Sequence, residues 1–326
     1  MTRRSFITVT AGGLLARPLG AGAQPAKPVR IGVLRAAPDG VVFREGFELF
    51  RQVLRGNGFV EGANFTIEYR VRAGSAEEIA TLAGELAHPR IDAIVAIGPA
   101  AVRAAAAATK SIPIVAVDLE SDPVAEGFVG SLGRPGGNLT GLFLDFPALS
   151  GKWIELLKEM VPRLSRIGVL WDPTTPPNLL KGAGAAAGTL RVEIFPVEAR
   201  APEELAPAFR SAVEKRAGGV LVLSSPLFYS ARAQIVAMAA RHRAPTIMPF
   251  PEFAEDGGLM AYGASVPGMY RQAGDVMVKV LRSGRPGDIP IERPARFELI
   301  VNRKTAASLG LVVPRSLFAR ADKVIE

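Results

Sequence analysis

The chain has 326 residues, of which 48% are hydrophobic and 21% are charged, and its formal net charge is +8. This length predicts about two domains, and the composition is that of a globular protein with substantial cores. The absence of cysteine excludes disulfide bonds, thiolate metal sites, cysteine nucleophiles and a lipid anchor attached through cysteine.

The positive charge does not by itself indicate a nucleic-acid partner. Arg3, Arg4 and Arg17 lie in the amino-terminal segment, and the remaining arginines are scattered among acidic residues. The sequence has no basic block interleaved with aromatic residues and no signature of a nucleic-acid-binding module. We therefore expect a solvated surface and no nucleic-acid partner.

The first residues have the features of an export signal. Thr2–Ile7 is a twin-arginine pattern, the apolar run Ile7–Ala16 follows it, and Ala21–Ala23 offers a small-x-small cleavage site. The apolar run is about half as long as the roughly 20 residues that a membrane span needs. We predict that residues 1–23 are removed and that the mature chain starts at Gln24 in the periplasm, without a lipid anchor.

From residue 30 short apolar strands alternate with amphipathic segments, which is the βαβ rhythm of an α/β protein. Phe43, Phe47, Phe50 and Leu54 recur at spacings of three and four residues, which predicts one apolar helical face. The predicted strands of this half are 30–34, 65–71, 91–97 and 112–117, and the predicted helices are 43–56, 79–86 and 99–109.

The apolar stretch RIGVL occurs twice, at Arg30–Leu34 and at Arg166–Leu170. After the second copy the same rhythm restarts. We predict strands at 191–197, 219–223 and 246–248, helices at 202–217 and 230–242, and a further segment at 178–189. Each copy is thus expected to be the first strand of a doubly wound sheet, in two similarly built lobes.

The two halves are connected by turn-rich sequence. Residues 133–141 lack the G-x-G-x-x-G order of a phosphate loop and are predicted to be a crossover between lobes. Beyond the second half the chain continues through 257–263, a helix at 266–283, a Pro/Gly segment at 284–290 and a strand at 297–301. These additional elements indicate several crossings between the lobes, and therefore a hinge.

No catalytic or metal-binding motif is evident in the sequence. His88 and His242 each fall at the end of a predicted helix, where a cation suits the helix dipole, and neither has a second ligand at metal spacing. A G-x-S-x-G elbow and a G-x-x-x-x-G-K-[ST] loop are also absent. We predict no metal, no cofactor and no enzymatic activity.

Candidate binding residues follow the predicted strands, because ligands of open α/β sheets bind outside the carboxyl ends of strands. Gly98–Pro99 opens a helix whose free N–H groups suit a carboxylate; the alternative is a plain capped helix start. The acids are candidate partners of an ammonium group or helix N-caps, and the rings are candidates for stacking or for core packing. The candidates are Ala36, Gly98, Pro99, Ala100, Asp118 and Asp122 in the first lobe, and Ser224, Ser225, Phe228, Phe250 and Glu252 in the second.

Several short motifs extend over essentially the whole mature chain: Gly58–Gly62, Asp122–Val124, Arg134–Gly141, Ser150–Lys152 with Glu155–Lys158, Gly257–Met260 and Ala319–Asp322. Together they resemble the extracytoplasmic ABC transporter substrate-binding proteins of the tryptophan/tyrosine-binding type. The resemblance implies a type I periplasmic binding fold, an α/β architecture of two doubly wound parallel-sheet lobes joined by three hinge strands.

The resemblance also implies a first lobe at 28–144 and 252–286 and a second at 145–251 and 287–326. The lobes are expected to close on a small molecule and to deliver it to an ABC permease of the inner membrane, and the binding protein is expected to be a monomer. For an amino-acid ligand, the carboxylate is expected near Gly98 and Pro99.

The sequence departs from the pattern of this family at three positions. Relatives often have a hydroxyl residue in place of Pro99, an acid in place of Ser225 and a basic residue in place of Pro251. The ligand therefore stays open between an amino acid and an aromatic or carboxylate compound. Two further functions also stay open: a periplasmic ligand sensor for a membrane receptor, and an exported α/β enzyme.

Overall fold

A computed structural model describes residues 27–37, 39–144 and 146–326. The predicted export signal and the cleavage site before Gln24 lie outside these residues. No helix in the described part of the chain is both long and apolar enough to cross a membrane.

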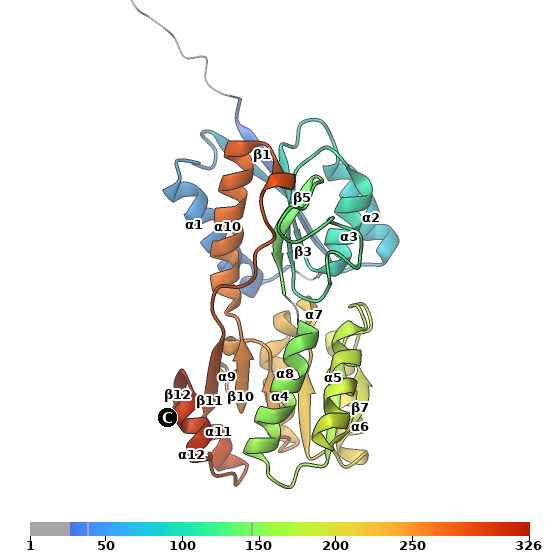
Figure 1. Cartoon of the computed structure of the whole chain (residues 1–326), viewed down its shortest axis with the longest axis vertical. Helices are drawn as coiled ribbons and strands as arrows, with labels where there is room; N and C mark the ends of the chain where they lie inside the picture. The colour runs from blue at the N-terminus through green and yellow to red at the C-terminus, as the bar shows by residue number, and fades with distance from the viewer. Residues whose placement is uncertain (1–26, 38, 145) are drawn as a thin grey trace, which may run out of the picture.

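Two lobes lie one above the other along the long axis of the molecule (Figure 1). Within the described residues the first lobe holds a five-stranded parallel sheet of order β2-β1-β3-β4-β5. Helices α1 and α10 cover one face of this sheet, and α2 and α3 cover the other. The bounds are β1 Val29–Arg35, α1 Val41–Gly56, β2 Phe65–Val71, α2 Ala76–Leu86, β3 Ala93–Ile97, α3 Pro99–Ala108, β4 Ile114–Asp118, β5 Leu139–Phe143 and α10 Val266–Ser283.

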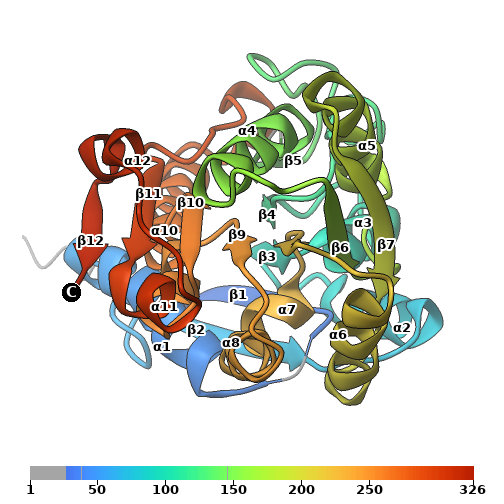
Figure 2. The same ribbon diagram turned by 90° about the horizontal axis from the view of Figure 1, so that it is seen from below.

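The second lobe holds, within the described residues, a seven-stranded sheet of order β12-β11-β10-β9-β8-β6-β7. Helices α4 and α5 lie on one side of it and α6 and α8 on the other (Figure 2). The bounds are α4 Phe146–Met160, β6 Arg166–Trp171, α5 Asn178–Leu190, β7 Glu193–Glu198, α6 Leu205–Glu214, β8 Gly219–Val222, α7 Pro226–Ser230, α8 Arg232–Arg241, β9 Thr246–Met248, α9 Pro251–Glu255, β10 Met260–Gly263, β11 Glu298–Asn302, α11 Arg303–Ser308, α12 Arg315–Arg320 and β12 Lys323–Ile325.

The two copies of RIGVL are β1 and β6, and each pairs in parallel with the two strands beside it. The repeated glycine has the same role in both copies. A Cβ on Gly32 would lie 3.0 Å from Leu86 of α2, and one on Gly168 would lie 3.2 Å from Ala212 of α6. In each lobe a helix thus packs closely over the first strand, which confirms two similarly wound halves.

The predicted aromatic face of α1 forms part of the core of the first lobe. Phe43, Phe47, Phe50 and Leu54 are all buried. The ring of Phe47 stacks on that of Phe50, with 4.7 Å between the centroids, and meets Tyr270 of α10 edge-on at 5.9 Å. A helix from late in the sequence therefore completes the lobe that the early sequence begins.

Two segments differ from the sequence-based assignment. Residues 139–141, predicted to belong to a turn, begin β5, an edge strand that pairs with β4. Residues 252–263, assigned to the first lobe, belong to the second, because β10 pairs with β9 and β11. Residues 287–292 stay with the first lobe, where the Glu292 amide donates to the carbonyl of Gly141 at 2.9 Å.

The described chain passes between the lobes three times: from β5 to α4, from β10 to α10, and from the segment beside β5 to β11. Three adjacent connections restrict the relative motion of the lobes mainly to opening and closing, since the backbone changes are confined to a few residues. The predicted multi-strand hinge is confirmed.

Candidate functional site

The lobes touch where the carboxyl ends of their parallel strands face each other. The hydroxyl of Ser224 donates to Glu120 Oε1 across the lobe boundary, and Arg35 Nη2 donates to Ser230 Oγ at 2.8 Å. Gly98 also faces Pro226, whose Cγ would lie 2.8 Å from a Cβ on the glycine. The structure is therefore a closed arrangement of the two lobes.

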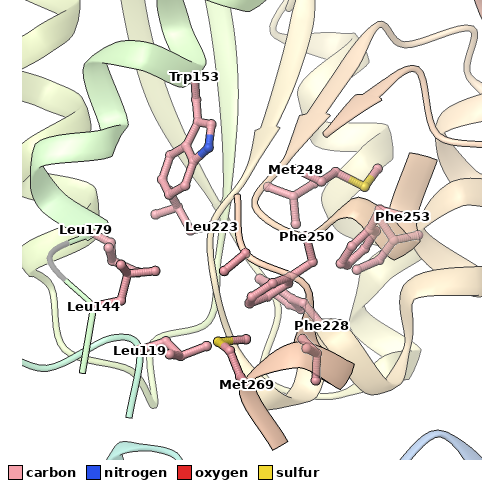
Figure 3. Packing of buried hydrophobic residues seen from close by; sticks show 14 of the residues in the cluster. Leu119, Leu144, Trp153, Leu179, Leu223, Phe228, Met248, Phe250, Phe253 and Met269 are labelled. Carbon is pink, nitrogen blue, oxygen red and sulfur yellow. The ribbon is translucent and has the colours of Figure 1, made fainter. Parts of the chain in front are cut away.

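A partly open cavity of about 50 Å³ lies between the lobes. A volume of this size holds water molecules rather than a ring-sized ligand, so a larger ligand requires the lobes to separate slightly. Figure 3 shows Leu119, Met269 and Phe250 of its wall, which come from three separate parts of the chain. The lining residues are Arg35, Ile97, Gly98, Val117, Leu119, Glu120, Ser225, Pro226, Tyr229, Phe250, Val266, Met269 and Tyr270.

A second compartment of about 200 Å³ shares Ile97, Gly98 and Pro226 with the cavity. The Gly98–Pro226 contact therefore stands between the two spaces. This compartment is more polar, because Asp172, Thr174 and Thr175 of the second lobe contribute to it. The predicted residues Ala36, Gly98, Pro99 and Ala100 all line it.

Two further predicted residues, Ser225 and Phe250, line the cavity. Ser225 is the N-cap of α7, where its hydroxyl accepts from the Leu227 amide at 3.0 Å and donates to Asp172 Oδ2 at 2.5 Å. The ring of Phe250 lies edge-on to Tyr229, with 5.3 Å between the centroids. Ser224 binds Glu120 of the opposite lobe instead of lining the cavity.

Besides Ser224, four predicted residues do not line either space. Asp118 is completely buried, and its Oδ1 accepts from the backbone amides of Glu120 and Ser121. Glu252 Oε1 accepts from Ser265, and Phe228 is buried in the core. Asp122 is exposed and caps a turn by accepting from Val124. For the three acids the capping alternative fits these contacts, because each of them accepts a hydrogen bond from a backbone amide.

Glu120 is an acid that the sequence analysis missed, and it is only 3% exposed. Burial, followed by repulsion from Asp118, raises the pKa of the Glu120 carboxyl to about 8. Burial likewise raises the pKa of Asp118. Since two carboxylates cannot both be ionised cheaply in a buried site, the neutral form of Glu120 is favoured near neutral pH.

Replacing Glu120 by glutamine is expected to flatten the pH dependence of thermal stability. In the unfolded chain the pKa of Glu120 returns to its ordinary 4.5, so the folded state retains a proton that the unfolded state has lost. The wild-type melting temperature should therefore fall as pH rises between about pH 5 and about pH 8, and then level off. Melting curves across this range check the difference between wild type and Glu120→Gln.

Glu85→Gln serves as the control, because Glu85 is exposed on the same lobe and pairs with Arg70. It should leave the pH dependence unchanged. The same slope in Glu120→Gln as in the wild type would show that burial does not hold a proton on Glu120.

Other residues of the cavity also escaped the sequence analysis: Arg35, Tyr229, Met269 and Tyr270. The sequence does contain a feature that points to Arg35, since a charged residue directly follows the apolar strand RIGVL, where ligand-binding residues are expected. Met269 and Tyr270 had none, because they lie within a helix and not after a predicted strand, and the packing of that helix depends on tertiary structure.

Comparison with known proteins decides the family. Residues 43–325 match the model of the family described as ABC transporter substrate binding protein. The chain belongs to this family. The description of this family is that of substrate-binding proteins.

Relatives agree with this assignment. The chain is 27% identical to a tyrosine-binding protein of Clostridioides difficile over 267 residues, which is 80% of this chain and 75% of the relative. Among solved structures, a conserved domain protein of Vibrio cholerae has a TM-score of 0.82 at 23% identity, covering 91% of this chain and 100% of that one. An ABC domain of Streptococcus pneumoniae in complex with L-Trp has a TM-score of 0.80 at 22% identity, covering 92% and 100%. These structures have the type I periplasmic binding fold found here.

Proposed function

We propose that this protein is the extracytoplasmic solute-binding component of an ABC importer, closing its two lobes on a small molecule and delivering it to an inner-membrane permease. The proposal rests on the cavity between the lobes of a family member, at the carboxyl ends of the parallel strands of both lobes. The tyrosine-binding relative and the relative solved with L-Trp favour a ligand with an aromatic or apolar body.

The proposed site combines the cavity with the neighbouring compartment. Ala36, Gly98, Pro99 and Ala100 approach the ligand from the first lobe, and Ser225 and Phe250 approach it from the second. A ligand that touches both lobes favours the closed state over the open state, and this difference in affinity shifts the hinge equilibrium. The permease then recognises the closed surface. In this proposal the protein works as a periplasmic monomer after removal of residues 1–23.

A thermal-shift screen of the purified protein tests the proposal. The panel contains amino acids, aromatic acids, purines, sugars and small carboxylates. A compound at about a hundredfold over its dissociation constant should add roughly 2.7 kcal/mol to the free energy of unfolding, which raises the melting temperature by several degrees. Small-angle X-ray scattering should give a smaller radius of gyration with the compound than without it, because in this proposal the ligand-free protein populates an open state and the ligand shifts the hinge equilibrium toward closure.

Scattering and thermal stability test different parts of the proposal. Binding without a decrease in the radius of gyration would contradict closure of the lobes on the ligand. A folded protein that no compound of the panel stabilises would contradict the solute-binding function itself.

A further inference from the structure

Among the described residues that line the cavity between the lobes, Arg35 is the one with a cationic side chain. Arg35 ends β1 and is only 3% exposed. Its guanidinium lies over the ring of Phe43, 4.8 Å from the centroid, and reaches Ser230 of the opposite lobe. A guanidinium is a planar fork of N–H donors that matches the two oxygens of a carboxylate. The cavity therefore presents a cationic group, held in place by contacts with both lobes.

The rest of the wall suits an apolar body. Ile97, Val117, Leu119, Val266 and Met269 line the cavity with aliphatic and thioether groups. The rings of Tyr229, Phe250 and Tyr270 contribute aromatic surface. Aromatic side chains favour contact with another ring, either stacked or edge-on. A carboxylic acid with a ring or a branched apolar body fits both features, because its carboxylate can bind Arg35 and its body can pack against this apolar wall.

The acid that lines the cavity is already engaged in hydrogen bonds. Among the residues that the structure describes, Glu120 is the one acid lining the cavity, and its oxygens accept from the Ser224 hydroxyl and the Leu119 amide. Burial also raises the pKa of Glu120, which favours its neutral form. In the neighbouring compartment, Asp172 accepts from Ser225 and Thr174.

An ammonium group bound beside Arg35 in the cavity would lose its hydration and find there only Glu120, whose neutral form is favoured, and this is costly in a buried site. The cation of Arg35 in the same cavity adds repulsion. We infer that the ligand is an aromatic or apolar monocarboxylate without an α-ammonium group, and that Arg35 binds its carboxylate. This inference rests on the proposed function and narrows its ligand class.

Matched pairs of ligands test the inference on the wild-type protein. Hydrocinnamate, phloretate and indolepropionate are L-phenylalanine, L-tyrosine and L-tryptophan with the ammonium group replaced by hydrogen. Isothermal titration calorimetry should show at least one of these acids binding about tenfold or more tightly than its amino acid. The ring, chain length and carboxylate are the same within each pair, so the difference reports on the ammonium group alone.

Arg35→Met then tests the anchor. We expect the affinity for the acid that binds to fall by about a hundredfold, because a buried carboxylate loses a charge-assisted hydrogen bond. Arg35→Lys should recover part of this loss, since the charge stays but the fork is lost. Arg44→Met is the control, because Arg44 is an exposed arginine of α1 that pairs with Asp39. Circular dichroism checks that each variant is folded.

The amide hydrocinnamide gives a readout that does not depend on the stability of the variants. It should bind weakly to the wild type, and Arg35→Met should leave that binding unchanged. An amino acid that binds as tightly as its deaminated partner would overturn the inference. A neutral or cationic compound that binds in the wider screen would also overturn it. Both results would leave the solute-binding function intact. Absence of binding to every compound in both experiments would contradict the proposed function as well.

Discussion

Replacing Gly98 by alanine is expected to weaken ligand binding by about tenfold or more, which corresponds to about 1.4 kcal/mol. Gly98 precedes α3 with φ at 86° and ψ at 161°, a region essentially restricted to glycine that costs other residues of the order of 1–3 kcal/mol. The new methyl group would also lie 2.8 Å from Cγ of Pro226 in the opposite lobe. This contact exists only when the lobes are closed, so the clash penalises the closed state specifically.

Gly58→Ala provides the matched control for this prediction. Gly58 has φ at 91°, and a Cβ there would meet no atom within 4 Å. It should therefore show backbone strain from its own positive φ, measured as a lower melting temperature, without a change in affinity. Pro226→Ala combined with Gly98→Ala should recover the part of the affinity that the clash removes. Equal affinities for Gly98→Ala and the wild type would mean that binding does not require this approach of the lobes.

Replacing Trp153 by alanine is expected to lower the free energy of unfolding by about 3–5 kcal/mol. Trp153 lies on α4 and is completely buried, at the position labelled in Figure 3. Its indole nitrogen donates to the carbonyl of Tyr262 in β10 at 2.7 Å. The alanine variant therefore leaves both a cavity in the core and a carbonyl without its donor, next to the second connection between the lobes.

Trp153→Phe separates the two contributions. Phenylalanine keeps most of the buried ring and loses the hydrogen bond, so this variant should cost only about 1–2 kcal/mol. Trp171→Phe, at the partly exposed end of β6, should cost less than either variant of Trp153. Urea unfolding measures all three. A cost for Trp153→Ala no larger than that for Trp153→Phe would mean that the surrounding core refills the space.

The sequence predicted the elements well where burial follows a local period. The apolar face of α1 repeats every three to four residues, and RIGVL begins a buried strand in each half of the chain. Such patterns depend on which side of an element faces the core, and a short window of sequence carries that information. The order of strands and helices therefore followed from the sequence, and so did the recognition of the family.

Assignments that depend on distant partners could not be made in this way. The first three residues of β5, 139–141, were predicted to belong to a turn. The glycine-rich sequence before them gives a strong local turn signal, while the pairing of β5 with β4 is a tertiary contact. Residues 252–263 were placed in the wrong lobe for a similar reason. Nothing local in β10 specifies that it pairs with β9 on one side and with β11, more than thirty residues later, on the other.

By itself the sequence determined the two wound lobes, the hinge and the edge of each sheet at which a ligand is expected, since these follow from local periodicity and the rules of parallel sheets. Only the tertiary structure decided which side chains line the cavity. It turned Asp118 toward backbone amides and brought Arg35, Glu120 and Tyr270 to the space between the lobes. The physical reason is that a side chain after a strand can cap its own loop or face the opposite lobe with equal local cost, and the packing of the two lobes selects between them.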